Sequence, residues 1–178
     1  MSDAALILCS PLDGKAVGDA GSPLWLAAPV PGHVVQILAA PTANDAATVL
    51  ASLAERQGAS LRPAGPGQWL LVGDRPLEPT GLQAIAAALD GRADVLDQSH
   101  GRVRIALGGS AVRTVLAKGT ALDLHPHAFP VGASAMTMIG HLAVHLTKVD
   151  DDRFEIVVTR SFAESLWEDL EAMAAEYL

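Results

Sequence analysis

The chain has 178 residues with a formal net charge of −8, and half of its residues are apolar. This length and composition suit one good core or two small ones and exclude an intrinsically disordered chain. Lys and Arg form no cluster, which argues against a nucleic-acid partner, and the single cysteine, Cys9, excludes disulfide scaffolds and cysteine zinc sites within the chain.

Residues 1–32 lack sustained periodicity because prolines and glycines interrupt them. They contain the apolar run Leu24, Trp25 and Leu26, so two interpretations stay open. The segment is either a disordered arm or an arm that orders against a partner or against the chain's own core. The start lacks the basic residues and long apolar run of a signal peptide, and no window approaches the roughly 18 apolar residues that span a bilayer. We therefore expect a soluble cytoplasmic protein.

Between residues 33 and 99 the pattern predicts strands that alternate with two helices. The helices are bounded by recognisable signals: Asp45 as a cap and Gly58 as a stop for the first, Pro79 as a start and Gly91 as a stop for the second. The turn residues Gly65-Pro66-Gly67 separate two of the strands. The expected strands are 33–40, 60–62, 69–72 and 93–97.

The second half opens with a strand at 102–107, with Val103, Ile105 and Leu107 inside and Arg102 and Arg104 outside. Ser110 is expected to cap the following helix, and Gly119 to end it.

An extended loop then leads from Leu122 to a strand at 141–149. Along that strand Leu142, Val144 and Leu146, with Lys148 on the same face by the period of two, alternate with His141, Ala143, His145 and Thr147, which indicates a sheet with one buried face. Asp150 to Asp152 form a turn, and a strand from Phe154 to Val158 completes an antiparallel hairpin with Glu155 and Thr159 on its opposite face. Ser161 and Glu164 have the spacing of a capping box, followed by a helix with one apolar stripe.

The order β-α-β-β-α-β followed by β-α-β-β-α predicts an α+β fold of two related β-α-β-β-α halves. We expect mainly antiparallel sheets, each with its helices on one face. The predicted organisation is an N-terminal arm at 1–32 and a domain at 33–178, with halves of about 33–99 and 100–178 that divide near Ser99 to Gly101.

Six histidines suggest a metal, but their spacing does not support one. His141 and His145 lie four residues apart in a strand, which separates them by about 13 Å. His125 and His127 flank Pro126 in a loop, and two ligands are too few for a structural zinc. We interpret these histidines as solvent or interface residues.

Other motifs also fall short of a reaction centre. Asp97, Ser99 and His100 are the residue types of a hydrolase triad, but triad members normally come from separate parts of a fold, so a turn is expected here. Gly108-Gly109 lacks the full patterns of a phosphate-binding loop. Asp150 to Asp152 is too short for a calcium loop, and Trp69 and Trp167 are expected in the core. We predict no catalytic, cofactor-binding or metal residue, which is more typical of a binding or assembly protein.

Three segments carry a family resemblance: GPGQWLLVGD at 65–74, SHGRVRIALGGSAVRTVLAKGTALDLHPHAFPVG at 99–132, and FEIVVTRSFAESLWEDL at 154–170. Together they resemble the gamma subunit of heterotetrameric sarcosine oxidase, over roughly residues 30 to 175. That subunit is similar in fold to the folate-binding domain of the glycine cleavage T protein, so a folate-binding-domain-like fold is implied. Gly101 departs from the arginine that often follows Ser-His in the family, so a contact there can differ.

The resemblance implies a non-catalytic structural subunit, packed chiefly on the alpha subunit, with beta and delta subunits completing the complex. Such a complex oxidatively demethylates sarcosine to glycine and yields hydrogen peroxide and 5,10-methylenetetrahydrofolate. FAD, FMN, NAD, tetrahydrofolate and zinc would be held by the other subunits. Two alternatives stay open: a stand-alone folate-binding or aminomethyltransferase-like domain that uses Asp97 or Asp123, and a small hydrolase that uses Ser99 and His100.

Overall fold

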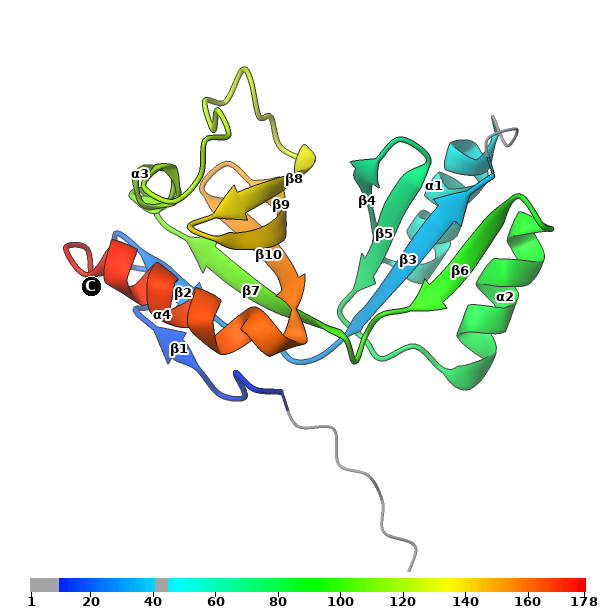
Figure 1. The fold of residues 1–178 in the computed structure, drawn as a ribbon, viewed down its shortest axis with the longest axis horizontal. Coiled ribbons are helices and arrows are strands. Elements are labelled where there is room, and N and C mark those ends of the chain that lie inside the picture. Colours follow the sequence, from blue (N-terminus) through cyan, green and yellow to red (C-terminus); the bar gives the residue numbers. More distant parts are fainter. Residues whose placement is uncertain (1–9, 41–44) are drawn as a thin grey trace, which may run out of the picture.

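The computed structural model describes residues 10–40 and 45–178, which form two antiparallel sheets with helices on their outer sides (Figure 1). The strands are β1 (Ala16–Val17), β2 (Trp25–Ala27), β3 (His33–Ala39), β4 (Ser60–Gly65), β5 (Gln68–Gly73), β6 (Ala93–Asp97), β7 (Arg102–Gly108), β8 (Ser134–Ile139), β9 (Leu142–Asp150) and β10 (Arg153–Thr159). The helices are α1 (Ala46–Gln57), α2 (Pro79–Leu89), α3 (Val112–Ala117) and α4 (Ala163–Ala174), and a 3-10 turn, η1 (Arg160–Phe162), precedes α4. The two sheets face each other like the walls of a narrow V, joined at its base by the chain between β6 and β7, and β4 lies close to β8 across the upper part.

The first sheet has the strand order β4-β5-β3-β6 and carries α1 and α2 on its outer side. Its β-α-β-β-α-β order confirms the prediction for this half. α1 ends at Gly58, whose φ of 61° is the left-handed conformation that glycine adopts without steric cost. Asp45 occupies the predicted N-cap position, but its carboxylate makes no capping hydrogen bond and lies 3.5 Å from Arg92 Nε instead.

The second sheet has the order β1-β2-β7-β10-β9-β8, with α3 and α4 on its outer side. The predicted hairpin is confirmed, since β9 and β10 pair antiparallel around the aspartate turn. The expected loop before β9 is partly wrong, because Ser134–Ile139 forms the strand β8 and pairs with β9. Small residues and two methionines give this stretch weak β propensity, so pairing with β9 decides its conformation.

Two predicted helix caps are also wrong. Ala111, not Ser110, occupies the N-cap position of α3. The capping box at Ser161 does not form, because Phe162 precedes the first residue of α4 and makes no side-chain cap. The N–H of Arg160 donates to Gly101 O at 2.9 Å, which keeps the chain against β7 one residue beyond β10. The next residues then turn in a 3-10 conformation before the α-helix can start.

The described part of the N-terminal segment orders against the chain's own core. β2 pairs with β7, and Leu26 lies opposite Leu107. The side chains of Leu12 and Leu24 are fully buried in the cluster between the second sheet and its helices. Residues 16–27 therefore extend the second sheet, although they precede the whole first half in sequence.

Three apolar clusters hold the layers together. The largest lies between the second sheet and α3 and α4 and contains Trp167, which is 1% exposed. A smaller cluster lies between the first sheet and its helices, where Trp69 is only partly buried. A third, of Val34, Leu70, Val72 and Val157, joins the two sheets face to face. Within the described ranges no helix combines the length and apolar character needed to cross a bilayer.

Replacing Leu24 with Ala should lower the free energy of unfolding by about 2–5 kcal/mol, because it removes fully buried methyl groups from the largest cluster. Val30→Ala is the matched control, since Val30 lies in the same N-terminal segment with its side chain 81% exposed. Urea denaturation followed by tryptophan fluorescence measures both. Equal stability of the two variants would contradict the packing of this segment in the core.

Candidate functional site

The inner faces of the two sheets meet in a layer that contains buried charge. Glu155 of β10 is 4% exposed and accepts hydrogen bonds from two arginines. Arg62 Nη1 lies 2.5 Å from Glu155 Oε1. Arg104 donates through Nε to Oε1 at 3.1 Å and through Nη2 to Oε2 at 2.7 Å. Since Arg62 comes from β4 and Glu155 from β10, the first of these pairs joins the two sheets.

Arg104 links the sheets a second time. It belongs to β7, yet its Nη1 donates to Gly73 O at 3.1 Å and its Nη2 lies 2.7 Å from Asp74 Oδ1, at the end of β5. We call Arg62, Arg104, Glu155 and Asp74 the inter-sheet ion network. Its geometry corrects the prediction that Arg104 points outward, because the second face of β7 meets another sheet instead of solvent.

His145 adds a neutral contact to the same layer. Its side chain is fully buried, and Nε2 lies 2.9 Å from Pro63 O in β4. A carbonyl oxygen can only accept, so the ring carries its proton on Nε2. Nδ1 is buried and has no hydrogen-bond partner within the described residues. His145 is therefore an interface histidine, one of the two interpretations expected from the sequence.

These surroundings set the ionisation of the layer. Burial raises the pKa of Glu155, but the Arg104 hydrogen bond and the charge of Arg62 outweigh it, so the pKa falls below its ordinary 4.5. The hydrogen bond from Arg104 likewise lowers the pKa of Asp74. Burial lowers the pKa of His145 below 6.5, and the nearby Arg62 and Arg102 add to this effect. At neutral pH both carboxylates are ionised and the histidine is neutral.

A groove of about 350 Å³ opens beside the network and is lined by Ser60, Arg62, Asp74, Arg104, Arg153 and Glu155, among others. Arg104 and Glu155 are paired with each other, and Glu155 is also paired with Arg62. A carboxylate held ionised by two arginines is a poor general acid or base near neutral pH. The arrangement is thus suited to holding two sheets at a fixed angle.

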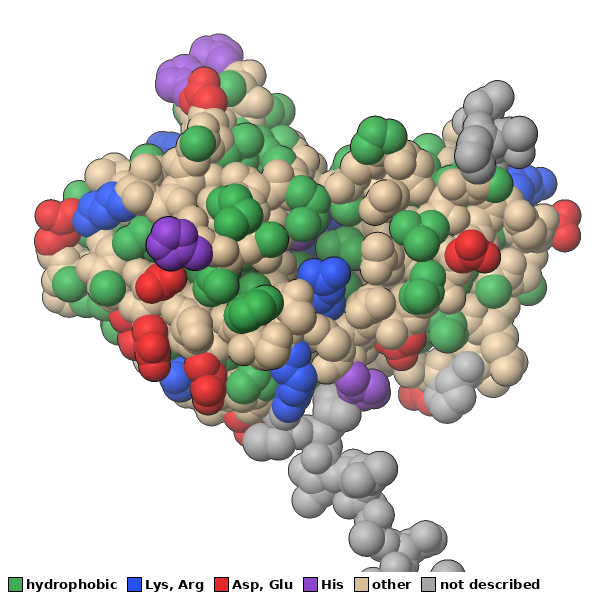
Figure 2. All heavy atoms as spheres, in the orientation of Figure 1, with side chains coloured by type: hydrophobic (Ala, Val, Ile, Leu, Met, Phe, Trp, Pro, Cys, Tyr) green, Lys and Arg blue, Asp and Glu red, His purple; other side chains and the backbone are tan. Residues whose placement is uncertain are grey.

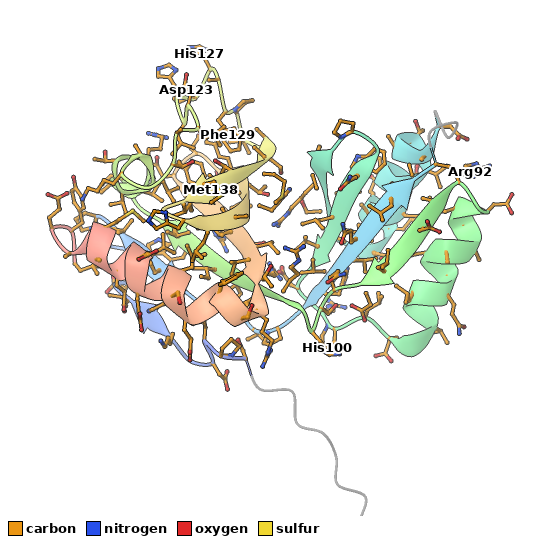
Figure 3. All side chains as sticks on the ribbon, viewed as in Figure 1. Arg92, His100, Asp123, His127, Phe129 and Met138 are labelled. Atoms are coloured by element: carbon orange, nitrogen blue, oxygen red, sulfur yellow. The ribbon has the colours of Figure 1, made fainter. Side chains whose placement is uncertain are left out.

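The structure brings together Ser99 and Asp97 of the possible triad, without His100. Ser99 Oγ donates to Asp97 Oδ1 at 2.5 Å and accepts from the N–H of Val34 at 3.1 Å. No hydrogen bond joins His100 to Ser99 among the described residues, and His100 is exposed at the base of the V (Figure 3). Ser99 and Asp97 therefore close the turn between the halves, as the structural interpretation predicted.

His125 and His127 lie in an exposed loop that projects from the second half (Figure 3). Their rings stack with centroids 5.3 Å apart, and Asp123 Oδ1 accepts from the N–H of His125 at 2.9 Å. Within the described residues no three His, Cys, Asp or Glu side chains lie close enough to hold a metal ion.

The glycine pair Gly108-Gly109, at the end of β7, has a steric explanation. A Cβ on Gly108 would lie 2.4 Å from Trp25 Cζ2, and one on Gly109 would lie 2.4 Å from Pro23 O. Gly109 also has a φ of 113°, which favours glycine. The pair thus allows the N-terminal segment to cross the end of β7.

Sequence reasoning missed the ion network because it assigned the second face of β7, β9 and β10 to solvent. One signal was available: Ile156, Val157 and Val158 are consecutive apolar residues, and such runs are typical of strands covered on both faces. The pairing of Arg62 with Glu155, 93 residues apart, has no local signature.

Replacing Glu155 with Gln should destabilise the fold by about 3–5 kcal/mol, because it leaves two buried arginines without a full counter-charge. Glu55→Gln, at an exposed side chain of α1, is the control. Because the folded-state pKa of Glu155 is lowered, its contribution is present above pH 4.5 and is lost as the pH falls through the folded-state value. Denaturation at several pH values measures both effects, and a Glu155→Gln variant as stable as Glu55→Gln would refute the network.

His145 should make the fold less stable in mild acid. Because burial lowers its pKa, the stability contributed by the neutral ring is present above pH 6.5 and decreases as the pH falls through the folded-state value. His145→Gln keeps a donor for Pro63 O but does not titrate, so it should lose less stability over that range than the wild type. Thermal melts at pH 7.5 and 5.5 test this, and identical pH profiles would contradict it.

Comparison with known proteins agrees with this architecture. Residues 17–176 match the model of the sarcosine oxidase, gamma subunit family. The chain is 31% identical over 108 residues to sarcosine oxidase subunit gamma of Corynebacterium sp. (strain P-1), covering 61% of this chain and 53% of that protein. It is 30% identical over 110 residues to the subunit gamma of Arthrobacter sp., with 61% and 53% covered. The chain thus spans about half the length of the curated relatives it matches.

Two solved structures are also similar. One is the heterotetrameric sarcosine oxidase from Corynebacterium sp. U-96 in complex with pyrrole 2-carboxylate, at a TM-score of 0.75 and 25% identity, covering 89% of this chain and 87% of that one. The other is the glycine cleavage system aminomethyltransferase T from Bartonella henselae, at a TM-score of 0.56 and 18% identity, covering 78% and 43%. The second shows the shared fold alone and confirms the expected likeness to the T protein. The chain belongs to the sarcosine oxidase gamma subunit family.

Proposed function

We propose that this chain is the non-catalytic gamma subunit of a heterotetrameric sarcosine oxidase. The observation that carries the proposal is the fold match to a solved heterotetrameric sarcosine oxidase, which extends over most of both chains. The family match over residues 17–176 supports the same role.

The geometry of the inner layer supports a structural function. Glu155, Arg62 and Arg104 are held by one another, and His145 by a backbone carbonyl. Ser99, the residue closest to a nucleophile by sequence pattern, donates to Asp97 and accepts from a backbone amide. The ion network and His145 hold the two halves together, and Ser99 closes the turn between them, which supports the role of a rigid assembly subunit.

The complex is proposed to demethylate sarcosine oxidatively to glycine, with hydrogen peroxide and 5,10-methylenetetrahydrofolate as products. In this proposal FAD, FMN, NAD, tetrahydrofolate and zinc belong to the other subunits. The alpha subunit is the chief partner, with beta and delta subunits completing the complex. A cytoplasmic location stays a prediction.

The alternative of a stand-alone folate-binding or aminomethyltransferase-like domain requires a carboxylate that can hold a pterin ring. Both candidates have local structural roles. Asp97 accepts from Ser99 at the base of the V, and Asp123 accepts from the N–H of His125 in the projecting loop (Figure 3). The two carboxylates therefore lie at opposite ends of the molecule.

Co-expression with the alpha, beta and delta subunits tests the proposal. We expect the tagged chain to co-purify with all three and the complex to release hydrogen peroxide from sarcosine, while the chain alone releases none. Omitting this chain should reduce the yield of assembled complex. Turnover by the isolated chain, or its failure to co-purify, would overturn the assignment.

Two assays on the isolated chain, one of binding and one of covalent labelling, test the folate-binding and hydrolase alternatives. Calorimetric titration with tetrahydrofolate should give no heat of binding, and tight binding would favour the folate-binding domain. A fluorophosphonate probe should leave Ser99 unlabelled. Labelling that disappears in Ser99→Ala would revive the hydrolase.

A further inference from the structure

The two sheets have four edge strands, and three of them are protected against pairing with another chain. β1 has only two residues. β4 contains Pro63 and a register shift between Pro63 and Gly65. β6 carries Asp94 and Asp97. Short length, proline, irregularity and charge are the features by which soluble proteins protect sheet edges.

β8 has none of these features. Its six residues, Ser134–Ile139, contain no charge and no proline, and it lies at the end of the second sheet. Its register with β9 is regular from end to end. Within the described residues, no backbone hydrogen bond joins β8 to anything but β9.

The backbone groups of the outer edge can be identified from the pairing. The N–H of Lys148 donates to Ala133 O, so residue 133 faces β9. Because the inward and outward positions of an antiparallel strand alternate, 135, 137 and 139 also bond to β9. Ser134, Met136 and Met138 then direct their N–H and C=O groups away from the sheet. These six groups form a row that another strand can pair with.

The side chains beside this row are apolar and half exposed. Met136 and Met138 are 49% and 47% exposed, and Val131 just before the strand is 51% exposed. Met136 pairs with His145, whose ring contacts Pro63 of β4, so both methionines lie on the inner face of the sheet. β4 passes close to β8, yet both methionine side chains stay about half exposed. Flexible thioether side chains adapt readily to an apolar partner.

One end of the edge lies next to acidic side chains. After β8 the chain turns at Gly140, and a Cβ there would lie 3.4 Å from Asp169 Oδ2 of α4. The exposed face of α4 also carries Glu164 and Glu168, and Figure 2 shows acidic side chains along this side of the molecule. A strand beside β8 would therefore gain electrostatic attraction from a basic residue at the Gly140 end.

We propose that the outer edge of β8 binds an extended segment of a partner subunit, which adds to the second sheet as a further strand. The segment has apolar residues at alternate positions against Met136 and Met138, and a Lys or Arg near Asp169. Backbone bonds supply affinity, and the alternating side chains supply specificity. This proposal rests on the proposed function, since it names the surface through which the subunit joins the complex.

Two variants test the edge in the co-expressed complex. Met136→Pro removes an outward N–H while leaving the bonds to β9, and Met138→Lys puts a charge on the apolar side of the edge. Each should lower the yield of co-purified complex roughly tenfold, because Met136→Pro removes a backbone hydrogen bond to the added strand and Met138→Lys places a charge in its apolar contact. Leu96→Lys on β6 is the matched control, since Leu96 is 41% exposed on the edge of the other sheet. Thermal melts of the isolated variants confirm that they fold.

Residue-resolved hydrogen exchange provides a second measurement on the wild type. The amides of 134, 136 and 138 should exchange rapidly in the free chain and slowly in the complex, while those of 135, 137 and 139 are protected in both. The proposed strand addition at β8 would be refuted if exchange at 134, 136 and 138 is the same in the free chain and the complex. It would also be refuted if the Met136→Pro and Met138→Lys variants fold and co-purify like Leu96→Lys. Neither result would contradict the subunit role. If the free chain dimerises and the dimer protects these amides, the edge binds a second copy of this chain, and the proposed binding of a partner subunit is refuted. If the wild type does not assemble at all, the subunit role itself fails and the edge proposal with it.

Discussion

The relative position of the two sheets depends on one carboxylate. Glu155 lies between Arg62 of the first sheet and Arg104 of the second, and Arg104 also reaches Gly73 and Asp74 at the end of β5. The apolar contact between the sheets is small, and among the described residues Val157 is its one buried member from the second sheet. Directional, charge-assisted bonds therefore determine the angle that a small hydrophobic patch alone would leave loosely defined.

Different layers of the structure stabilise the halves and orient them relative to each other. The large clusters lie on the outer sides, beneath the helices, and stabilise each half. The inner layer orients the halves, and β8, as the last strand of the second sheet, has one edge without a backbone partner among the described residues and carries half-exposed methionines. The solved heterotetrameric sarcosine oxidase from Corynebacterium sp. U-96 contains a chain with this two-half fold. The groups that would serve catalysis in another protein here hold backbone and neighbouring strands in place.

Much of the fold was predictable because local patterns and tertiary contacts agree. The strands at 33–39 and 102–108, the hairpin around Asp150 to Asp152 and the stop of α1 at Gly58 all have strong periodicity or turn chemistry. Predictions failed where a distant contact overrides a local preference. β8 exists because β9 offers a partner, and the Ser161 box does not form because Arg160 is still bonded to Gly101. The turn expected at Asp97, Ser99 and His100 is present, and Ser99 bonds to Asp97 within it.

The sequence by itself determined the two α+β halves, most of the antiparallel strands and the family, because periodicity, turn residues and the three matching segments are local properties of the chain. Only the tertiary structure decided that residues 16–27 join the second sheet, that Arg104 and Glu155 face inward, and that β8 is the unprotected edge. Alternation along a strand distinguishes two faces, but it cannot say whether the second face meets water or another sheet. That choice depends on contacts such as Arg62 with Glu155, which lie far apart in the chain and have no local pattern.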